Sequence, residues 1–285
     1  MLRVALPNKG RLADDVRELF GDAGLEVRAR GERALVASLG GEFEAILVRA
    51  KDIPEFVADG AADVGVTGWD LVCESQRGLG LLLDLEFGSC RLVVAARDDS
   101  GISTLEDISG SPRVATVFPH LAHRFFEAAN KAVSIVPVSG ATEIAPHLGI
   151  ADMIVDLTSS GSTLRVHQLH EVATVLESSA RLISSPGLSR EAARAADELA
   201  ESLSSVLRAR GKRYVMANVP RASLESTRRV MPGVNGPTVI DILDGGIYVA
   251  VHAVVAQSAI YRTVADLKAL GAQGILVTRI ERLMP

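Results

Sequence analysis

The chain has 285 residues, of which 48% are hydrophobic and 23% charged, and its formal net charge is −5 at pH 7. This length suits about two domains, or two and a small third, and the composition is that of a soluble globular protein. The acidic balance excludes a broad nucleic-acid surface, because binding to a phosphate backbone needs clustered positive charge. An anionic ligand would have to be met by a few cations placed locally.

Targeting segments and metal motifs find no support in the sequence. Residues 1–9 lack the apolar core of a signal peptide, and no stretch approaches the roughly 18 unbroken apolar residues of a membrane span, so we expect a cytoplasmic protein without a membrane partner. Cys73 and Cys90 make no C-x-x-C pair, and we expect two buried thiols. The six histidines lack the clustered cysteines or carboxylates that would complete a zinc site.

Two predicted strands near the start of the chain end in basic residues. Residues 2–6 are rich in strand formers and run into Pro-Asn-Lys-Gly-Arg at 7–11, before a helical pattern of apolar residues. Residues 43–48 form a second strand that runs into Arg-Ala-Lys at 49–51. In open α/β sheets ligands bind at the carboxyl ends of the strands. An anion site is therefore one interpretation of these cations, and a solvated turn is the other.

Strands and helices continue to alternate along the first hundred residues. Residues 62–68 read as a strand that closes on a glycine turn, with Asp70 just beyond it, and apolar runs follow at 79–83 and 91–96. This alternation predicts a mostly parallel sheet.

A second α/β unit begins at about residue 113. It has predicted strands at 113–117 and 133–138, a helix over 121–132 between them, and a helix near Glu143. Two such units in tandem predict a two-lobed protein with a cleft, as in periplasmic-type binding folds, and clefts between lobes commonly bind small ligands.

The most informative stretch follows the apolar strand 153–155. Asp156 ends this strand, and hydroxyl side chains then surround Gly161 before a helix starts. The glycine lets the backbone approach a ligand, while backbone N–H groups and hydroxyls supply donors, so the composition indicates a phosphate-binding loop. A turn with a capping serine explains the segment equally well. The chain contains neither a G-x-x-x-x-G-K-[ST] loop nor a G-x-G-x-x-G fingerprint, so a P-loop or Rossmann site is not supported.

The last third of the chain predicts a long helix and a small separate domain. Ser189 is placed to cap a helix that runs to about Arg210, and Gly211 is placed to end it. The remaining residues predict the order β-α-β-β-α-β, which is the ferredoxin-like unit.

Together these segments resemble the ATP phosphoribosyltransferase family, in its long form with a C-terminal regulatory domain. The run from Glu143 through Gly149 to residues 151–164 fits the family signature at every fixed position, and residues 6–12 and 48–54 agree with two further family segments. The resemblance covers the whole chain. It implies an α/β fold with a two-lobed, periplasmic-binding-protein-like catalytic core and a ferredoxin-like (ACT-like) regulatory domain.

The resemblance implies that N1 of the ATP adenine displaces pyrophosphate from C1 of phosphoribosyl pyrophosphate, with Mg2+ held mainly through substrate phosphates. No general base is expected. The residues that would bind phosphoribosyl pyrophosphate are Glu143, Asp156, Ser159, Ser160, Gly161, Ser162 and Thr163. Those that would face ATP are Lys9, Gly10, Arg11 and Asp70. The catalytic cations would be Lys9, Arg49 and Lys51.

The same resemblance implies a division of labour along the chain. Residues 1–95 with 176–211 would form catalytic lobe I, residues 96–175 lobe II, and residues 212–285 a domain that binds histidine as a feedback inhibitor. The histidine ligands would be Asn218, Val234, Thr238 and Gly274. Family members also lead us to expect dimers and histidine-favoured hexamers. The alternative from a different class is a cytosolic solute-binding or sensor protein that uses a two-lobed cleft without catalysis.

Overall fold

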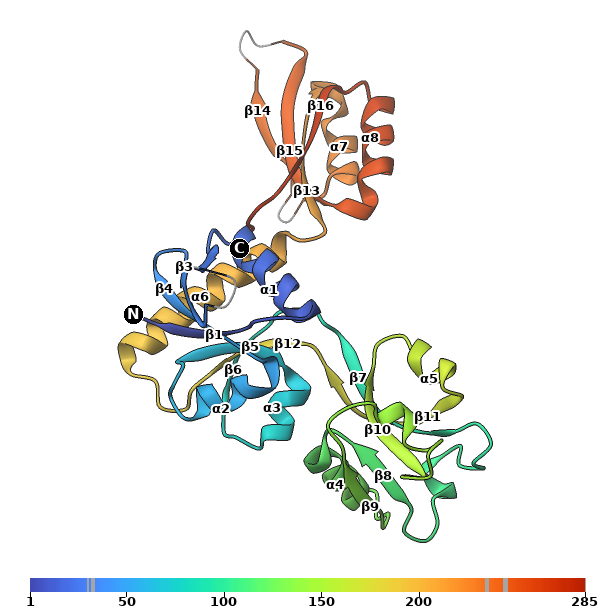
Figure 1. Ribbon diagram of the computed structural model, residues 1–285. Helices are drawn as coiled ribbons and strands as arrows, with labels where there is room; N and C mark the ends of the chain where they lie inside the picture. The colour runs from blue at the N-terminus through green and yellow to red at the C-terminus, as the bar shows by residue number, and fades with distance from the viewer. Residues whose placement is uncertain (30, 32–33, 234–235, 243–245, 285) are drawn as a thin grey trace. The chain divides into compact units, whose positions relative to one another are not determined.

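In the computed structural model, which describes residues 1–29, 31, 34–233, 236–242 and 246–284, the chain forms two compact units. The first unit is Met1–Glu201 and the second is Ser202–Pro285 (Figure 1). No helix in the described part is both long enough and apolar enough to cross a membrane.

The first unit contains a seven-stranded sheet. Its strands are β1 (Arg3–Pro7), β2 (Val27–Ala29), β3 (Val36–Leu39), β4 (Phe43–Val48), β5 (Val64–Gly68), β6 (Gly80–Asp84) and β12 (Ala180–Ser184). They lie in the order β2-β3-β4-β1-β5-β12-β6. Among these described strands, β1 is parallel to β4 and β5, and the other four pairings are antiparallel. The prediction of a mostly parallel sheet is therefore wrong, because the β2–β3–β4 meander and the returning strand β12 flank a parallel centre.

Helices follow each of the three central strands at the carboxyl edge. They are α1 (Arg11–Asp22) after β1, the 3-10 turn η1 (Ala50–Asp52) and α2 (Ile53–Ala58) after β4, and α3 (Trp69–Ser75) after β5. The apolar spacing of α1 buries Val16, Leu19 and Phe20, as its sequence predicts. Three residues separate β1 from α1, one separates β4 from η1, and none separates β5 from α3. The polar side chains at these short junctions therefore stay at the sheet edge.

A five-stranded sheet with its own core completes the first unit. Its strands are β7 (Cys90–Arg97), β8 (Arg113–Thr116), β9 (Ser134–Pro137), β10 (Met153–Thr158) and β11 (Leu169–Ser178), in the order β11-β7-β10-β8-β9. Its helical segments are η2 (Leu105–Asp107), α4 (Pro119–Ala128), η3 (Thr142–Ile144) and α5 (Ser162–Val166). Both faces are covered, since Val94 and Val155 pack in one cluster and Val93 and Ile154 in another.

Three predictions in this sheet need correction. The helix expected over 121–132 begins and ends earlier, as α4, because Pro119 suits a first helical position. The helix expected near Glu143 is a single 3-10 turn. Asp156 lies inside β10, which continues to Thr158, so the strand does not end at the carboxylate.

Two neighbouring segments join the sheets. The chain leaves β6 for β7 and returns from β11 to β12 through Ser179. The Ala180 N–H donates to the Phe87 carbonyl at 2.9 Å, and the Leu85 N–H donates to the Ala180 carbonyl at 3.0 Å. The Trp69 N–H donates to the Ser179 carbonyl at 2.9 Å, which ties the start of α3 to the same junction.

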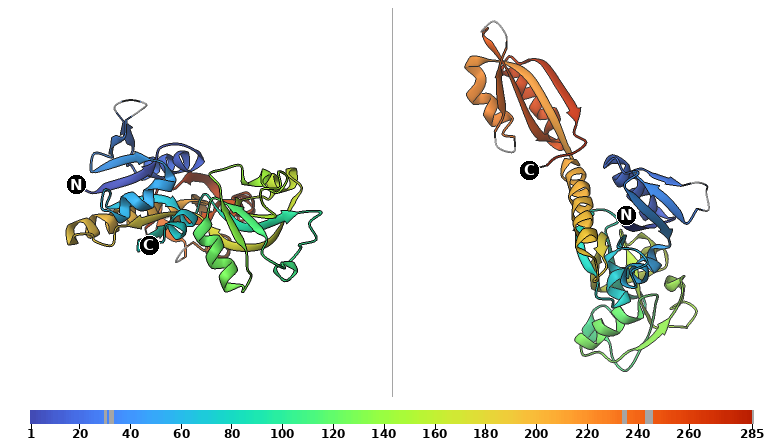
Figure 2. Two further views of the ribbon diagram at one scale, coloured as in Figure 1. Left: turned by 60° about the horizontal axis from the view of Figure 1, so that its bottom comes forward. Right: turned by 90° about the vertical axis from the view of Figure 1, so that its left-hand side faces the viewer.

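The long helix α6 (Arg190–Ala209) spans the boundary between the units (Figure 2). The Ser189 hydroxyl accepts the Ala192 N–H at 3.1 Å, and Gly211 has φ +68° just beyond the helix end. Both predicted helix signals are therefore confirmed.

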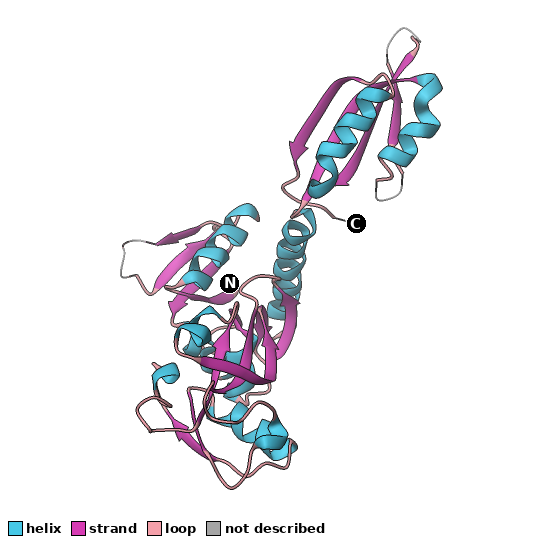
Figure 3. Cartoon of the chain, turned by 90° about the vertical axis from the view of Figure 1, so that its right-hand side faces the viewer, coloured by secondary structure: helices cyan, strands magenta, loops and turns pink. Residues whose placement is uncertain are grey.

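The second unit contains a four-stranded antiparallel sheet with two helices. The elements are β13 (Lys212–Pro220), η4 (Arg221–Ser223), α7 (Leu224–Val230), β14 (Thr238–Asp241), β15 (Tyr248–Ala256), η5 (Gln257–Ala259), α8 (Ile260–Ala269) and β16 (Gln273–Arg279). The strand order is β14-β15-β13-β16, and Figure 3 shows α7 and α8 on one face of the sheet. This arrangement confirms the predicted ferredoxin-like unit.

Candidate functional site

Three parallel strands bring the predicted first-lobe residues to one edge of the seven-stranded sheet. Pro7 at the end of β1 is in register with Val48 at the end of β4, and β5 lies on the other side of β1. The Asn8 N–H donates to the Val48 carbonyl at 2.8 Å, and the Thr67 hydroxyl donates to the Ala50 carbonyl at 2.8 Å. The loops after β1, β4 and β5 are thus tied to one another at their starts.

Four cationic side chains at this edge are exposed and have no acidic partner within the described ranges. They are Lys9, Arg11, Arg49 and Lys51. Several other arginines of the first unit are paired with carboxylates. The Arg91 guanidinium, for example, donates to both carboxylate oxygens of Glu171, at 2.7 and 2.9 Å. Cations without protein partners keep their charge available for an anionic ligand.

Asp70 is a buried carboxylate at the start of α3. Its Oδ1 accepts a hydrogen bond from the Ser178 hydroxyl at 2.5 Å, and its N–H donates to the same hydroxyl oxygen at 3.0 Å. Burial raises the pKa of Asp70, and hydrogen bonds from Ser178 and from backbone N–H groups partly offset this effect. The sequence places Asp70 just after a strand but does not reveal its burial.

The loop between β10 and α5 has the form of a tight turn closed by its own hydroxyls. The Gly161 N–H donates to the Thr158 hydroxyl at 2.9 Å, and Gly161 itself adopts φ +71°. The Ser160 and Ser162 hydroxyls lie 2.9 Å apart in a hydrogen bond. The side chains of Ser159, Ser160, Ser162 and Thr163 are exposed, so their polar groups face solvent or a ligand.

Asp156 and Glu143 are neighbours although 13 positions separate them. Burial is the main cause that raises the pKa of Asp156, and the nearby Glu143 carboxylate raises it further. The Leu157 N–H, which donates to Asp156 Oδ1 at 2.8 Å, and the Thr142 hydroxyl act in the opposite direction. Two adjacent carboxylates beside a hydroxyl-rich loop are suitable acceptors for sugar hydroxyls.

A cavity of about 470 Å³ lies between residues of the two sheets. Its lining includes Arg11 and Asp70 from the first sheet's side and Ser159 from the loop after β10. These three predicted residues are therefore brought together. The lining of this cavity in the described structure does not include Lys9, Gly10, Arg49, Lys51, Glu143, Asp156, Ser160, Gly161, Ser162 or Thr163.

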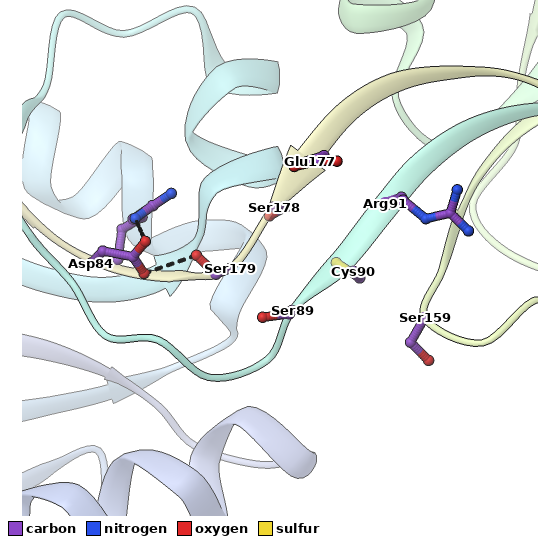
Figure 4. Close-up of a pocket in the computed structure, with 9 residues that line it drawn as sticks. Asp84, Ser89, Cys90, Arg91, Ser159, Glu177, Ser178 and Ser179 are labelled. Atoms are coloured by element: carbon purple, nitrogen blue, oxygen red, sulfur yellow. Dashed lines mark hydrogen bonds and ion pairs between the residues drawn. The ribbon is translucent and has the colours of Figure 1, made fainter. Parts of the chain in front are cut away.

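A second cavity, of about 330 Å³, shares Ser159 and lies at the junction of the sheets (Figure 4). Arg91, Cys90 and Ser178 line it, and the sequence gives no motif that singles out any of them. Asp84 accepts a hydrogen bond from the Ser179 hydroxyl at 2.9 Å and pairs with Arg181. The adjacent serines at 178 and 179 thus bind two different aspartates.

The two cysteines are not the buried thiols that the sequence predicts. Cys73 and Cys90 are both free and half-buried. Burial nevertheless raises the pKa of each thiol, so both remain protonated at neutral pH.

Two of the predicted histidine ligands lie side by side in the second unit. Asn218 on β13 is in register with Gln273, and a Cβ on Gly274 would lie 3.5 Å from the Asn218 Nδ2 atom. Thr238 begins β14 and pairs with His252 on β15, so β15 separates it from β13. Val234 lies outside the described residues.

Comparison with known proteins places the chain in a family. The sequence pattern described as ATP phosphoribosyltransferase matches residues 49–205, and the pattern described as the HisG C-terminal domain matches residues 209–282. Proteins named ATP phosphoribosyltransferase from Gemmatimonas aurantiaca and Natronomonas pharaonis are 66% and 48% identical to the chain, each over the full length of both sequences.

The fold agrees with this relationship. A chain of the solved ATP phosphoribosyl transferase (HisG:HisZ) complex from Thermotoga maritima superposes with a TM-score of 0.65 at 27% identity. The match covers 73% of this chain and 99% of that chain. The chain therefore belongs to the ATP phosphoribosyltransferase family, in the long form that carries the HisG C-terminal domain.

Proposed function

We propose that the protein transfers the phosphoribosyl group of phosphoribosyl pyrophosphate to N1 of ATP and releases pyrophosphate. The observation that carries this proposal is the pairing of two features across one cavity. Arg11 and Asp70 line it from the edge where four cations lack acidic partners in the described structure, and Ser159 of the hydroxyl-rich loop lines it from the other sheet. Two polyanionic substrates need such a set of cations and donors.

The loop after β10 is proposed to hold phosphoribosyl pyrophosphate. Exposed hydroxyls and backbone N–H groups around Gly161 would bind the 5-phosphate, and Glu143 and Asp156 would accept hydrogen bonds from the ribose hydroxyls. The residues assigned to this substrate remain Glu143, Asp156, Ser159, Ser160, Gly161, Ser162 and Thr163.

The opposite edge is proposed to hold ATP and the departing pyrophosphate. Lys9, Gly10, Arg11 and Asp70 are assigned to ATP, while Lys9, Arg49 and Lys51 are assigned to the reaction itself. Adenine N1 is already a nucleophile and pyrophosphate already a good leaving group, so no side chain need act as a base. Catalysis would come from aligning N1 with C1 and from neutralising charge as the C1–oxygen bond breaks.

Magnesium is proposed to enter with the substrates. The described residues contain no group of three or more His, Cys, Asp or Glu side chains placed to hold a metal. Phosphate oxygens of the substrates would supply most of the ligands, as they commonly do for Mg2+ in nucleotide enzymes. When bound, Mg2+ would neutralise negative charge on the pyrophosphate.

The second unit is proposed to bind histidine and to reduce activity when it does so. Asn218, Thr238 and Gly274 are assigned to that ligand, with Val234 as a further candidate from the sequence. The proposal includes assembly into dimers and hexamers, a cytoplasmic location, and the division into lobe I (1–95 with 176–211), lobe II (96–175) and regulatory domain (212–285).

The test of the function is pyrophosphate release by the purified full-length protein. With ATP, phosphoribosyl pyrophosphate and Mg2+ together, we expect continuous release, and with either substrate alone we expect none. A folded protein that binds the substrates without releasing pyrophosphate would favour a solute-binding or sensor protein instead.

A further inference from the structure

The Asp70 carboxylate is held by a residue far away in sequence. Ser178, which is buried at the end of β11, both donates to Asp70 Oδ1 at 2.5 Å and accepts the Asp70 N–H at 3.0 Å. A serine hydroxyl has one donor and two acceptor sites, and in this arrangement its donor is directed at the carboxylate. In the described structure no other side chain is hydrogen-bonded to Asp70.

Ser178 occupies the point where the chain returns from one sheet to the other. It is in register with Cys90 on β7, and the next residue but one, Ala180, is in register with Gly68 on β5. The backbone at this point is also fixed, since Ser179 accepts the Trp69 N–H. The position of the Ser178 hydroxyl is therefore set by strand pairing on both sides.

Asp70 and Ser178 each reach a cavity of the candidate site. Asp70 lines the larger cavity with Arg11 and Ser159, and Ser178 lines the adjoining one with Cys90 and Ser159. The Asp70 carboxylate has little freedom to rotate. Its Oδ1 atom accepts the Ser178 hydrogen bond and lies so close to Gly68 that a Cβ there would meet it at 2.4 Å.

We propose that Ser178 is a positioning residue for ATP, whose hydroxyl fixes the Asp70 carboxylate in the orientation and the ionised form that accept hydrogen bonds from the nucleotide. The inference deepens the proposed function and rests on it, because Asp70 is assigned there to the ATP side. Ser178 acts through Asp70 and makes no contact with the reacting atoms.

The Asp70→Asn substitution distinguishes the titration of Asp70 from that of the groups around it. Cys73 on α3 and Cys90 on β7 stay neutral in acid solution, since burial raises both thiol pKa values. Asp70 is the most completely buried carboxylate among the described residues, and Asp156, whose pKa burial also raises, is only partly buried. The other charged or titratable side chains on the elements packed against α3 and at the two cavities are Glu74 on α3 itself, Glu55 on α2, His120, His123, Arg124 and Glu127 on α4, His170, Glu171 and Glu177 on β11, Arg11 and Asp15 on α1, Asp84 on β6, Arg91 on β7, and Arg181 on β12.

The hydroxyl of Ser178 opposes the effect of burial, because a hydrogen bond to the ionised form lowers the Asp70 pKa. Removing the hydroxyl should therefore raise that pKa further. ATP binding that needs the carboxylate should then begin to fail at a higher pH than in the wild type.

The experiment compares Ser178→Ala with Ser179→Ala in the full chain. Both serines are buried and adjacent in the chain, but the Ser179 hydroxyl donates to Asp84 and not to Asp70. For Ser178→Ala we expect KM and Kd for ATP to rise about tenfold or more, as for a lost hydrogen bond to a charged group. The acid limb of kcat/KM for ATP should move to higher pH, while KM for phosphoribosyl pyrophosphate stays the same. Ser179→Ala should keep the wild-type acid limb.

A double variant tests whether Ser178 acts through Asp70. In the Asp70→Asn background, Ser178→Ala should change ATP binding little and should leave no acid limb to move. An unchanged acid limb in Ser178→Ala, or a full further loss of binding in the double variant, would overturn the proposal. If Ser178→Ala does not fold, Ser178→Cys, whose thiol is a weak donor of similar size, should give the same direction of shift, and a wild-type profile would count against it. Pyrophosphate release by the wild type reports on the proposed function separately.

Discussion

The proposed reaction depends most on the four cations at the ends of β1 and β4, which have no acidic partner in the described part of the chain. Arg49→Ala and Lys51→Ala should each lower kcat/KM by roughly a hundred- to a thousandfold, because removing one preorganised charge contact costs about 2.7 to 4 kcal/mol of barrier. Steady-state pyrophosphate release measures the effect.

Arg28 provides the matched control for these cations. It lies on the edge strand β2 and is 78% exposed, and it pairs with Glu26 two residues away. Arg28→Ala should change kcat/KM little. Equal kinetics for all three variants and the wild type would remove Arg49 and Lys51 from the mechanism.

The ionised Asp70 carboxylate is expected to reduce the free energy of unfolding at neutral pH. Because its folded-state pKa is raised by burial, the native state holds the proton more tightly than the unfolded chain does. The free energy of unfolding therefore falls as the pH rises through that pKa, and the whole reduction is present above it. Asp70→Asn should unfold at a higher temperature than the wild type at pH 7, and the difference should shrink in acid. A lower unfolding temperature at pH 7 would argue against this account.

At the level of elements, the loop between β10 and α5 depends on the left-handed conformation of Gly161. An alanine there is strained by about 1 to 2 kcal/mol, and its Cβ would lie 3.3 Å from the Arg165 Nη1 atom. Gly161→Ala should raise KM for phosphoribosyl pyrophosphate several-fold with little change for ATP.

Gly187→Ala is the matched control, because it makes the same glycine-to-alanine change at an unstrained position. A Cβ at Gly187 meets no atom within 4 Å, and this residue is outside the strained φ range. Gly187→Ala should keep wild-type constants for both substrates. If both substitutions changed KM for phosphoribosyl pyrophosphate equally, the left-handed conformation of Gly161 would not be needed to bind that substrate.

The elements that the sequence predicts best have strong local signals. Ser189 and Gly211 bound α6 as expected, and the buried alternation of Val215, Ala217 and Val219 marks β13 clearly. Strand β11 is not evident, because register shifts at Glu171–Ala173 and Thr174–Leu176 break the two-residue period. Since Ser178 ends this irregular strand, its bond to Asp70 could not be predicted.

At the level of the whole molecule, the second unit has a hydrophobic core of its own. Val215, Val251 and Leu267 pack within one cluster whose members all lie beyond residue 211. The sequence predicts this separation because the β-α-β-β-α-β order is complete within the last quarter of the chain. It cannot predict which side chains meet across the two sheets of the first unit, since those contacts depend on the crossing segments at residues 84–90 and 178–180.

A substitution in the second unit should separate regulation from catalysis. Asn218→Ala in the full chain should weaken inhibition by histidine about tenfold while preserving activity without histidine, since a side chain that binds the ligand loses its hydrogen bonds. Thr278→Ala, on the exposed strand β16, is the control and should keep normal inhibition. Truncation after Gly211 should leave some activity and abolish inhibition, and persistent inhibition would refute the placement.

The central claim is that one cavity joins the two substrates, and the bond that forms tests it most directly. Phosphoribosyl pyrophosphate labelled with carbon-13 at C1 can be mixed with ATP labelled with nitrogen-15 at N1, and the product examined by NMR. We predict a one-bond coupling between C1 and N1 that grows in step with pyrophosphate release. Release of pyrophosphate without that coupling, or no release by the folded protein, would contradict the account.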